Sequence, residues 1–117
     1  MSSIRFDRDA EGIVTLLLDA PGEPVNTMSA AFRADFAEAL DRLEREKGSI
    51  SGVVLTSAKS TFFAGANLRA VLAIGPDDEE AFFEEVESIK RSMRRLEKLG
   101  KPVVAAINGS ALGGGLE

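Results

Sequence analysis

The 117-residue sequence contains no cysteine, histidine, tryptophan or tyrosine. Without cysteine, a disulfide framework and thiol chemistry are excluded. Without histidine, the chain has neither an imidazole base nor the commonest metal ligand. The titratable groups that remain for catalysis are carboxylates, lysines and arginines, and we expect no metal site.

Positive charge is also scarce, because 14 Lys and Arg stand against 19 Asp and Glu and give a net charge of −5. This balance argues against a nucleic-acid partner, since phosphate contacts need clustered Lys and Arg. No apolar run approaches membrane-spanning length, and residues 1–7 do not resemble a signal peptide. We therefore expect a cytoplasmic protein that does not insert into membranes, with at most one domain in this length.

Short apolar segments predict the strands of a sheet. Residues 4–7 and 13–19 are expected to pair near one edge of that sheet. Residues 52–56 and 102–107 are continuous apolar runs rich in β-branched side chains. Such runs are typical of parallel strands buried on both faces.

Helical spacing of apolar residues predicts the helices that alternate with these strands. Ser29 is a plausible N-cap for a helix that runs to about Lys47, and a short helical segment begins near Asn67. Pro76 opens a longer helix that ends at Gly100, with a core-facing stripe formed by Phe82, Val86, Ile89, Met93 and Leu96. Strands alternating with helices predict an α/β fold with right-handed crossovers.

Two stretches repeat one plan: a buried strand, a turn of small residues and a helix start. The first turn contains residues 64–66 and the second contains residues 113–115. If the strands are neighbours, both turns lie at the carboxyl edge of the sheet, where α/β folds usually bind ligands. Unpaired N–H groups at helix starts could then aim at one oxygen atom, as in an oxyanion hole. Tight packing of small residues is the alternative interpretation of both turns.

The same residues resemble a known family. Residues 63–68 (Phe-Ala-Gly-Ala-Asn-Leu), together with residues 24–26 (Pro-Val-Asn) and the whole of 101–117, resemble the enoyl-CoA hydratase/isomerase (crotonase) superfamily. The sequence is similar to that of the amino-terminal hydratase domain of multifunctional fatty-acid β-oxidation proteins, in which a 3-hydroxyacyl-CoA dehydrogenase follows. The resemblance implies a crotonase-like ββα spiral, of which residues 1–117 would be the amino-terminal portion of one hydratase/isomerase domain.

The resemblance also implies roles for individual residues. The N–H groups of Ala66 and Gly114 would bind the carbonyl oxygen of a CoA thioester. Ala64, Ala66 and Leu68 would lie along the CoA-binding groove, much of it through main-chain contacts. Glu117 would match the first catalytic glutamate, a general acid/base in the addition of water across the 2,3 double bond.

The implied activity is hydration of 2-enoyl-CoA to 3-hydroxyacyl-CoA, with enoyl-CoA isomerisation as a further activity. Hydration needs no cofactor beyond the CoA thioester substrate, and NAD enters only if a dehydrogenase domain follows. A homo-oligomer or a β-oxidation complex is compatible with the full-length protein. The second catalytic glutamate of the family would lie beyond residue 117, so we expect the chain alone to be inactive. Isomerase-only or decarboxylase chemistry, or non-catalytic acyl-CoA binding, are the alternatives.

Two positions depart from the family pattern. Asn67 stands where the family commonly has Asp, and Glu23 stands where relatives often carry a basic residue near the CoA phosphates. Arg69 or Lys59 could replace that basic residue, although both are more simply interpreted as solvated charges.

Overall fold

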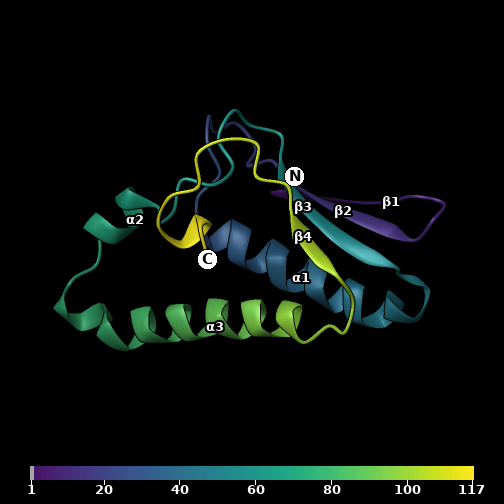
Figure 1. The fold of residues 1–117 in the computed structure, drawn as a ribbon. Coiled ribbons are helices and arrows are strands. Elements are labelled where there is room, and N and C mark those ends of the chain that lie inside the picture. Colours follow the sequence, from purple (N-terminus) through teal and green to yellow (C-terminus); the bar gives the residue numbers. More distant parts are fainter. Residues whose placement is uncertain (1) are drawn as a thin grey trace.

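The computed structural model describes residues 2–117 and contains one four-stranded sheet in the order β1-β2-β3-β4 (Figure 1). The strands are β1 (Ile4–Arg8), β2 (Ile13–Leu18), β3 (Gly52–Ser57) and β4 (Val103–Ala105). β1 and β2 are antiparallel, whereas β2, β3 and β4 are parallel to one another. The predicted edge hairpin and the predicted α/β class are both confirmed.

The turn between β1 and β2 fixes the register of the hairpin. Gly12 has a φ of +84°, and a Cβ at this position would lie 2.9 Å from the Ser49 carbonyl oxygen. The Asp9 carboxylate accepts the N–H groups of Glu11 and Ile13, each at 2.9 Å. This register turns alternate residues of β2 inward, and Val14, Leu16 and Leu18 are buried.

The helix α1 (Ala30–Glu46) covers one face of the sheet and begins where the sequence predicts. The Ser29 side chain caps it by accepting the Phe32 N–H at 3.1 Å, which satisfies one of the donors that a helix start leaves unpaired. A 3₁₀ turn, η1 (Lys47–Ser49), ends the helix. The core therefore lies between the sheet and α1, whose buried residues are Phe32, Phe36, Ala39, Leu40 and Leu43.

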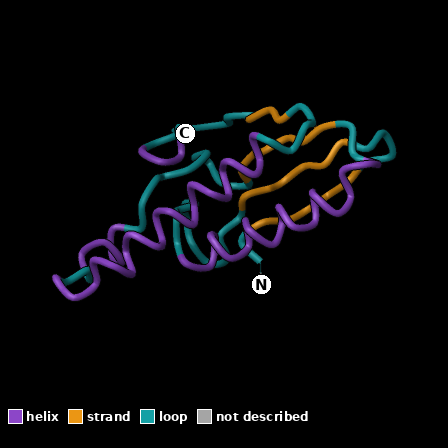
Figure 2. The backbone as a smooth tube through the Cα atoms, turned by 90° about the horizontal axis from the view of Figure 1, so that it is seen from below, coloured by secondary structure: helices purple, strands orange, loops and turns teal. Residues whose placement is uncertain are grey.

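The remaining helices are α2 (Leu68–Leu72), η2 (Pro76–Asp78), α3 (Glu79–Glu97) and η3 (Gly113–Gly115). Both long helices lie on the same side of the sheet, and α3 extends beyond the sheet toward α2 (Figures 1 and 2). α3 packs against α1 through its carboxyl half. None of the helices within residues 2–117 is long and apolar enough to cross a membrane.

The structure corrects the predicted burial of the last strand. The strand covers only residues 103–105 rather than 102–107, and Val104 and Ile107 are 57% and 54% exposed. Both long helices lie on one side of the sheet, so within the described residues neither of them covers the other face of β4. β3 is an inner strand, yet its residues 54–56 are only half-buried. The prediction of two strands buried on both faces is therefore wrong.

The apolar stripe of α3 is core-facing only along its carboxyl half. Ile89, Met93 and Leu96 pack against the core, whereas Phe82 and Val86 are exposed. The difference arises because the amino half of α3 runs past the sheet (Figure 1). Periodicity identified the correct face of the helix but not the length over which that face is covered.

Candidate active site

The turns that follow β3 and β4 lie against each other at the carboxyl edge of the sheet. The N–H groups of Phe62 and Phe63 donate to the Ser110 carbonyl oxygen at 2.9 and 3.2 Å. The Leu112 N–H donates in return to the Phe63 carbonyl oxygen at 2.9 Å. Residues 62–63 and 110–112 therefore continue the parallel pairing of β3 and β4 beyond the strand ends.

A third segment, residues 26–28, pairs with the other side of the first turn. The Ala64 N–H donates to the Asn26 carbonyl oxygen, and the Met28 N–H donates to the Gly65 carbonyl oxygen, both at 2.8 Å. Gly65 has a φ of +91°, and a Cβ here would lie 3.0 Å from the Leu112 carbonyl oxygen. Only glycine adopts this φ and avoids this close contact without strain. Glycine at this position therefore allows the turn to fit between residues 26–28 and residues 110–112.

The N–H groups of Ala66 and Gly114 donate no hydrogen bond to any group within residues 2–117. Both residues are exposed. Ala66 immediately precedes Asn67, the N-cap of α2, and Gly114 lies in the first turn of η3. The first N–H groups of a helical turn have no partner inside the turn, which explains the unpaired N–H of Gly114, whereas Ala66 lies in the loop just before the N-cap of α2.

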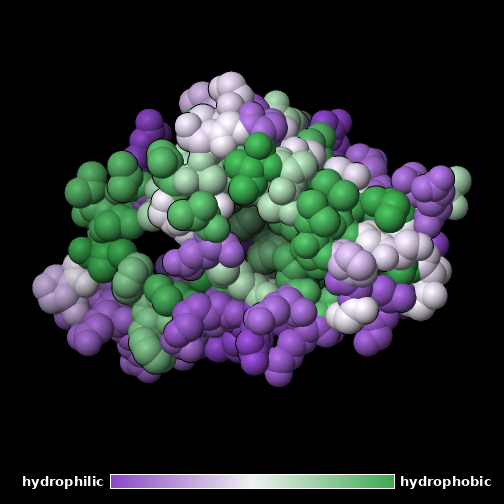
Figure 3. Space-filling view, in the orientation of Figure 1, coloured by the Kyte–Doolittle hydropathy of each residue, from purple (hydrophilic) through white to green (hydrophobic). Residues whose placement is uncertain are grey.

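An apolar cavity of about 500 Å³ opens between the sheet, α1 and α3. Figure 3 shows a hollow bordered by hydrophobic residues near the centre of this face of the molecule. Gly114 and Glu117 line the cavity, together with apolar residues that include Phe32, Phe63, Met93 and Val103. The Phe63 ring packs edge-on against Phe32 of α1, with 5.0 Å between ring centroids, and so ties the first turn to the helix.

A second cavity of about 490 Å³ lies between α2 and α3, and Ala66 lines it. Met28 and Ile89 line both cavities. A Cβ placed on Gly114 would lie 3.7 Å from the Met28 Cε atom. The two predicted oxyanion donors therefore belong to adjoining turns, but they line different cavities that share the side chains of Met28 and Ile89.

The other predicted site residues lie near these turns. Ala64 is half-buried in the first turn, and Leu68 is 72% exposed at the start of α2; neither lines a described cavity. Glu117 is exposed at the edge of the first cavity. Glu97 also lines that cavity and forms an ion pair with Arg94 at 3.0 Å. These two side chains are the carboxylates that the described residues supply there.

Lys59 is neither a free solvated charge nor available to a phosphate. Its Nζ atom donates to the Ala20 carbonyl oxygen at 2.8 Å and to Asp19 at 2.9 Å, and its side chain is only 15% exposed. The hydrogen bond from Lys59 lowers the pKa of the Asp19 carboxyl below its ordinary value. Arg69 and Glu23 are exposed, as expected for surface charges.

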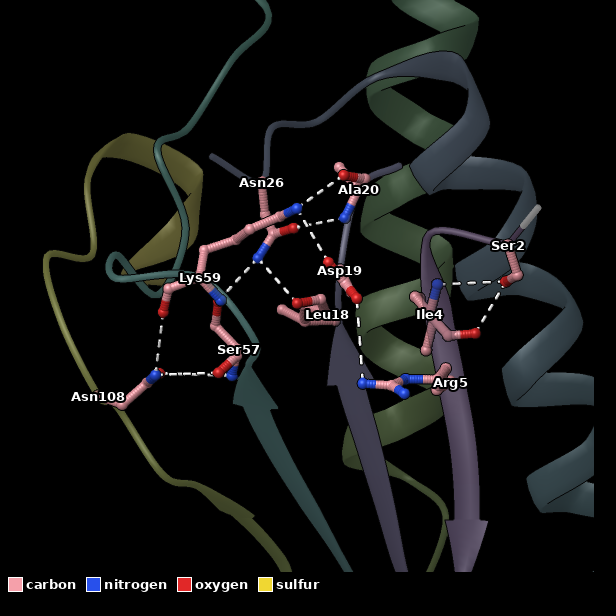
Figure 4. A network of polar contacts seen from close by, with 10 residues as sticks. All are labelled: Ser2, Ile4, Arg5, Leu18, Asp19, Ala20, Asn26, Ser57, Lys59 and Asn108. Carbon is pink, nitrogen blue, oxygen red and sulfur yellow. Dashed lines mark hydrogen bonds and ion pairs between the residues drawn. The ribbon is translucent and has the colours of Figure 1, made fainter. Parts of the chain in front are cut away.

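A polar network around the buried side chains of Asn26 and Ser57, at the end of β2 and β3, holds the first turn in place (Figure 4). The Asn26 carboxamide contacts Leu18, Ala20, Ser57 and Phe62. The Asn108 carboxamide binds the backbone of Ser57 and Lys59 from the other side. Asn26 lies within residues 24–26 of the family pattern, but no role was predicted for it, because a lone Asn in a Pro-rich loop does not reveal its burial.

Within residues 2–117, no group of three or more Asp, Glu, His or Cys side chains is placed to hold a metal ion. The chemical groups that the turns do offer are two unpaired N–H donors, a carboxylate and apolar walls. Such an arrangement can stabilise negative charge on an oxygen atom while an apolar chain lies alongside.

Solved structures with a similar fold include enoyl-CoA hydratases. The enoyl-CoA hydratase of Bacillus anthracis superposes with a TM-score of 0.84 at 31% identity, over 97% of this chain and 43% of that one. The enoyl-CoA hydratase of Thermoplasma volcanium superposes with a TM-score of 0.81 at 27% identity, over 100% and 44%. The fold is therefore part of the crotonase fold, as expected.

Curated relatives by sequence are much longer than this chain. The fatty acid oxidation complex subunit alpha of a Shewanella species is 40% identical over 117 residues, which cover 98% of this chain and 16% of that protein. The protein of the same name from Psychrobacter cryohalolentis is 38% identical over 107 residues, which cover 92% and 15%. The profile of the enoyl-CoA hydratase/isomerase family matches residues 8–117. The chain thus belongs to the enoyl-CoA hydratase/isomerase family.

Proposed function

We propose that this chain forms the acyl-CoA-binding and oxyanion-stabilising part of an enoyl-CoA hydratase site. A protein that carries the rest of the domain would hydrate 2-enoyl-CoA to 3-hydroxyacyl-CoA. The observation that carries the proposal is the pair of unpaired N–H groups, at Ala66 and Gly114, on two turns that pack together. The adjacent apolar cavity with Glu117 at its edge supports it.

The chemistry follows from where charge develops. When water adds to C3 of a 2-enoyl thioester, electrons move onto the carbonyl oxygen and give an enolate. Donors fixed at that oxygen stabilise the enolate more than the neutral thioester, and therefore lower the barrier. Loss of one such donor costs on the order of 10²–10³ in rate. Glu117 would accept a proton from the attacking water or return one to C2, while Ala64 and Leu68 border the CoA chain.

The chain by itself is proposed to bind a CoA thioester without turning it over. The family resemblance implies that hydration uses two carboxylates around one water molecule. The described residues supply only Glu97 and Glu117 to the cavity, and Glu97 is held by Arg94. Calorimetry with crotonyl-CoA, together with a spectroscopic assay for loss of its double bond, tests both parts. We expect binding and negligible turnover. Appreciable turnover would contradict the proposed inactivity of the chain, and no binding would contradict its proposed role in binding CoA thioesters.

The role of Glu117 is tested in a protein extended to the full hydratase domain. We expect Glu117→Gln to lower kcat by about 10²-fold or more, because the amide cannot exchange a proton with water. Glu97→Gln is the matched control, since it neutralises a carboxylate that lines the same cavity, and it is expected to leave kcat near that of the unmodified protein. Equal rates for Glu117→Gln and the unmodified protein would favour an acyl-CoA-binding role without acid–base chemistry.

The wider assignment to fatty-acid β-oxidation rests on the names of the curated relatives. Isomerase activity is a further proposal, and the family description supports it. A following 3-hydroxyacyl-CoA dehydrogenase with NAD and an oligomer or complex remain predictions from the family resemblance. A cytoplasmic location remains a prediction from the sequence composition. The residues that follow 117 in the longer protein discriminate hydration from isomerisation or decarboxylation alone, because hydration predicts a second glutamate there.

A further inference from the structure

Asn26 is a polar side chain that is only 2% exposed, and it lies at the carboxyl end of the sheet. Its Nδ2 atom donates to the Leu18 carbonyl oxygen at 3.1 Å and to the Ser57 Oγ atom at 2.9 Å. A longer bond of 3.3 Å reaches the Phe62 carbonyl oxygen, and Oδ1 accepts the Ala20 N–H at 2.9 Å. Because a buried amide that loses its partners is costly, these bonds hold Asn26 in one orientation.

The backbone of Asn26 belongs to the segment that pairs with the first turn. Its carbonyl oxygen accepts the Ala64 N–H, and two residues later the Met28 N–H donates to the Gly65 carbonyl oxygen. This pairing forms a parallel bridge between Met28 and Ala66. The side chain of Asn26 is thus anchored to the strand ends, while its backbone supports the turn whose last residue presents the Ala66 N–H.

We propose that Asn26 is a positioning residue of the oxyanion hole, whose carboxamide sets the place of the Ala66 N–H relative to that of Gly114. The proposal rests on the proposed function. Its physical basis is that Asn26 bonds the start of the turn at Phe62, and the N–H of Phe62 in turn bonds Ser110 on the segment that leads to Gly114. Substitution of a merely structural residue would weaken the binding of all ligands alike. Substitution of a positioning residue selectively weakens the binding of ligands that carry a carbonyl oxygen.

The experiment uses the 117-residue chain with two ligands: crotonyl-CoA, and the thioether analogue in which a methylene replaces the carbonyl group. We expect the unmodified chain to bind crotonyl-CoA more tightly than the thioether. Asn26→Ser should weaken the binding of crotonyl-CoA about tenfold, the scale of one displaced hydrogen bond. It should weaken the binding of the thioether by less than about twofold. Infrared spectroscopy gives a second readout, because the bound thioester carbonyl band, lowered by the two donors, should return toward its free frequency.

Two further variants separate positioning from loss of stability. Ile50→Ala removes a buried side chain at the amino end of β3, the opposite edge of the sheet, and should leave the preference for crotonyl-CoA unchanged in the folded protein. Ser57→Ala removes one partner of Asn26 and should reduce the preference about threefold, a smaller loss than Asn26→Ser. If Asn26→Ser does not fold, the ligand preference and the carbonyl band of Ser57→Ala test the positioning role of Asn26 instead.

The outcomes distinguish the two proposals. If the unmodified chain shows no preference for crotonyl-CoA over the thioether, the proposed oxyanion function fails. If it shows the preference and Asn26→Ser retains it with an unshifted carbonyl band, the function stands and the positioning role of Asn26 is overturned. The same loss of preference in Ile50→Ala would also overturn the positioning role.

Discussion

At the scale of single residues, neighbouring glycines of the second turn differ in the space that surrounds them. A Cβ on Gly115 would lie 2.7 Å from the Phe63 Cβ atom and 2.8 Å from its carbonyl oxygen. A Cβ on Gly114 would meet only the Met28 Cε atom, at an ordinary contact distance of 3.7 Å. The third glycine of the run is thus required for the approach of the two turns, whereas the second is required only where a ligand must reach the backbone.

We expect Gly115→Ala to lower the free energy of unfolding by about 1–3 kcal/mol, the usual cost of overpacking. Gly114→Ala is the matched control and should change stability by less than about 1 kcal/mol. Urea denaturation of both variants measures the difference. Equal stabilities would show that the two turns do not pack as closely as described.

The ion pair between Lys59 and Asp19 predicts a pH effect. The hydrogen bond from Lys59 holds the pKa of Asp19 below its ordinary value of 3.8. A lowered folded-state pKa stabilises the fold above the unfolded pKa, and this contribution is lost as the pH falls through the folded pKa, below 3.8. In Lys59→Met, an NMR titration of the Asp19 carboxyl should show its midpoint rising toward the ordinary value.

Arg5→Met is the control for this titration, because Arg5 stands 3.9 Å from the same carboxylate and is 61% exposed. Its effect on the Asp19 midpoint should be the smaller of the two. A larger rise of the Asp19 midpoint in Arg5→Met than in Lys59→Met would show that Lys59 is not the main cause of the lowered Asp19 pKa.

Residue types and spacing predicted that the turns at 64–66 and 113–115 lie at the same edge of the sheet if their strands are neighbours, and the pairing of β3 with β4 confirms it. The sequence could not reveal that Met28 lies between the cavities of Ala66 and Gly114, because this depends on how side chains from α1, α3 and the loop before α1 pack. It also could not reveal the burial of Asn26. Short-range patterns report backbone turns well, but side-chain surroundings arise from contacts between distant segments.

At the scale of elements, α2 is a helix of five residues whose start depends on Asn67. The Asn67 Oδ1 atom accepts the N–H groups of Arg69 and Ala70 at 3.1 and 3.3 Å. Asp is common at this position in the family, and a carboxylate provides the same acceptor with a charge that suits a helix start. The departure from the family pattern thus preserves the cap.

We therefore expect Asn67→Asp to keep α2 intact and Asn67→Ala to destabilise it locally by about 1 kcal/mol. Amide hydrogen exchange at Arg69 and Ala70 is the measurement. Exchange at these amides should accelerate about fivefold in Asn67→Ala and remain unchanged in Asn67→Asp. Unchanged exchange in Asn67→Ala would show that packing, rather than the cap, holds α2.

The elements that sequence predicted best are those with strong local signals. Ser29 marked the start of α1, and Pro76 marked the start of the η2–α3 segment. The errors lie in burial: Val104 of β4 and the apolar residues Phe82 and Val86 in the amino half of α3 are exposed. Local composition shows which face an element hides but not whether a neighbour exists to cover it.

At the scale of the whole molecule, one edge of β4 has no strand partner within residues 2–117, and exposed apolar side chains surround it. Val104, Ile107, Leu112 and Leu116 are all more than half exposed. Unpaired edges with apolar neighbours are typical sites of strand-to-strand association. The 117-residue chain is therefore expected to self-associate through this edge as its concentration rises.

Sedimentation velocity over a range of concentrations tests this expectation. Val104→Lys should shift the chain toward monomer, because a charge at the edge opposes pairing with a second strand. Val71→Lys, on the exposed surface of α2, is the control and should leave association unchanged. A chain that stays monomeric at all concentrations, or equal effects of both variants, would rule out the β4 edge as the contact.

The stacking of residues 26–28, 63–66 and 110–112 also determines when the site can form during folding. These three segments are far apart in the sequence, and their pairing closes two long loops that contain both major helices. Loop closure over such separations is entropically costly and slow, so it follows the local formation of α1 and α3. The ability to bind a thioester oxygen should thus appear only in the last kinetic phase of refolding, and would serve as a direct signal that folding is complete.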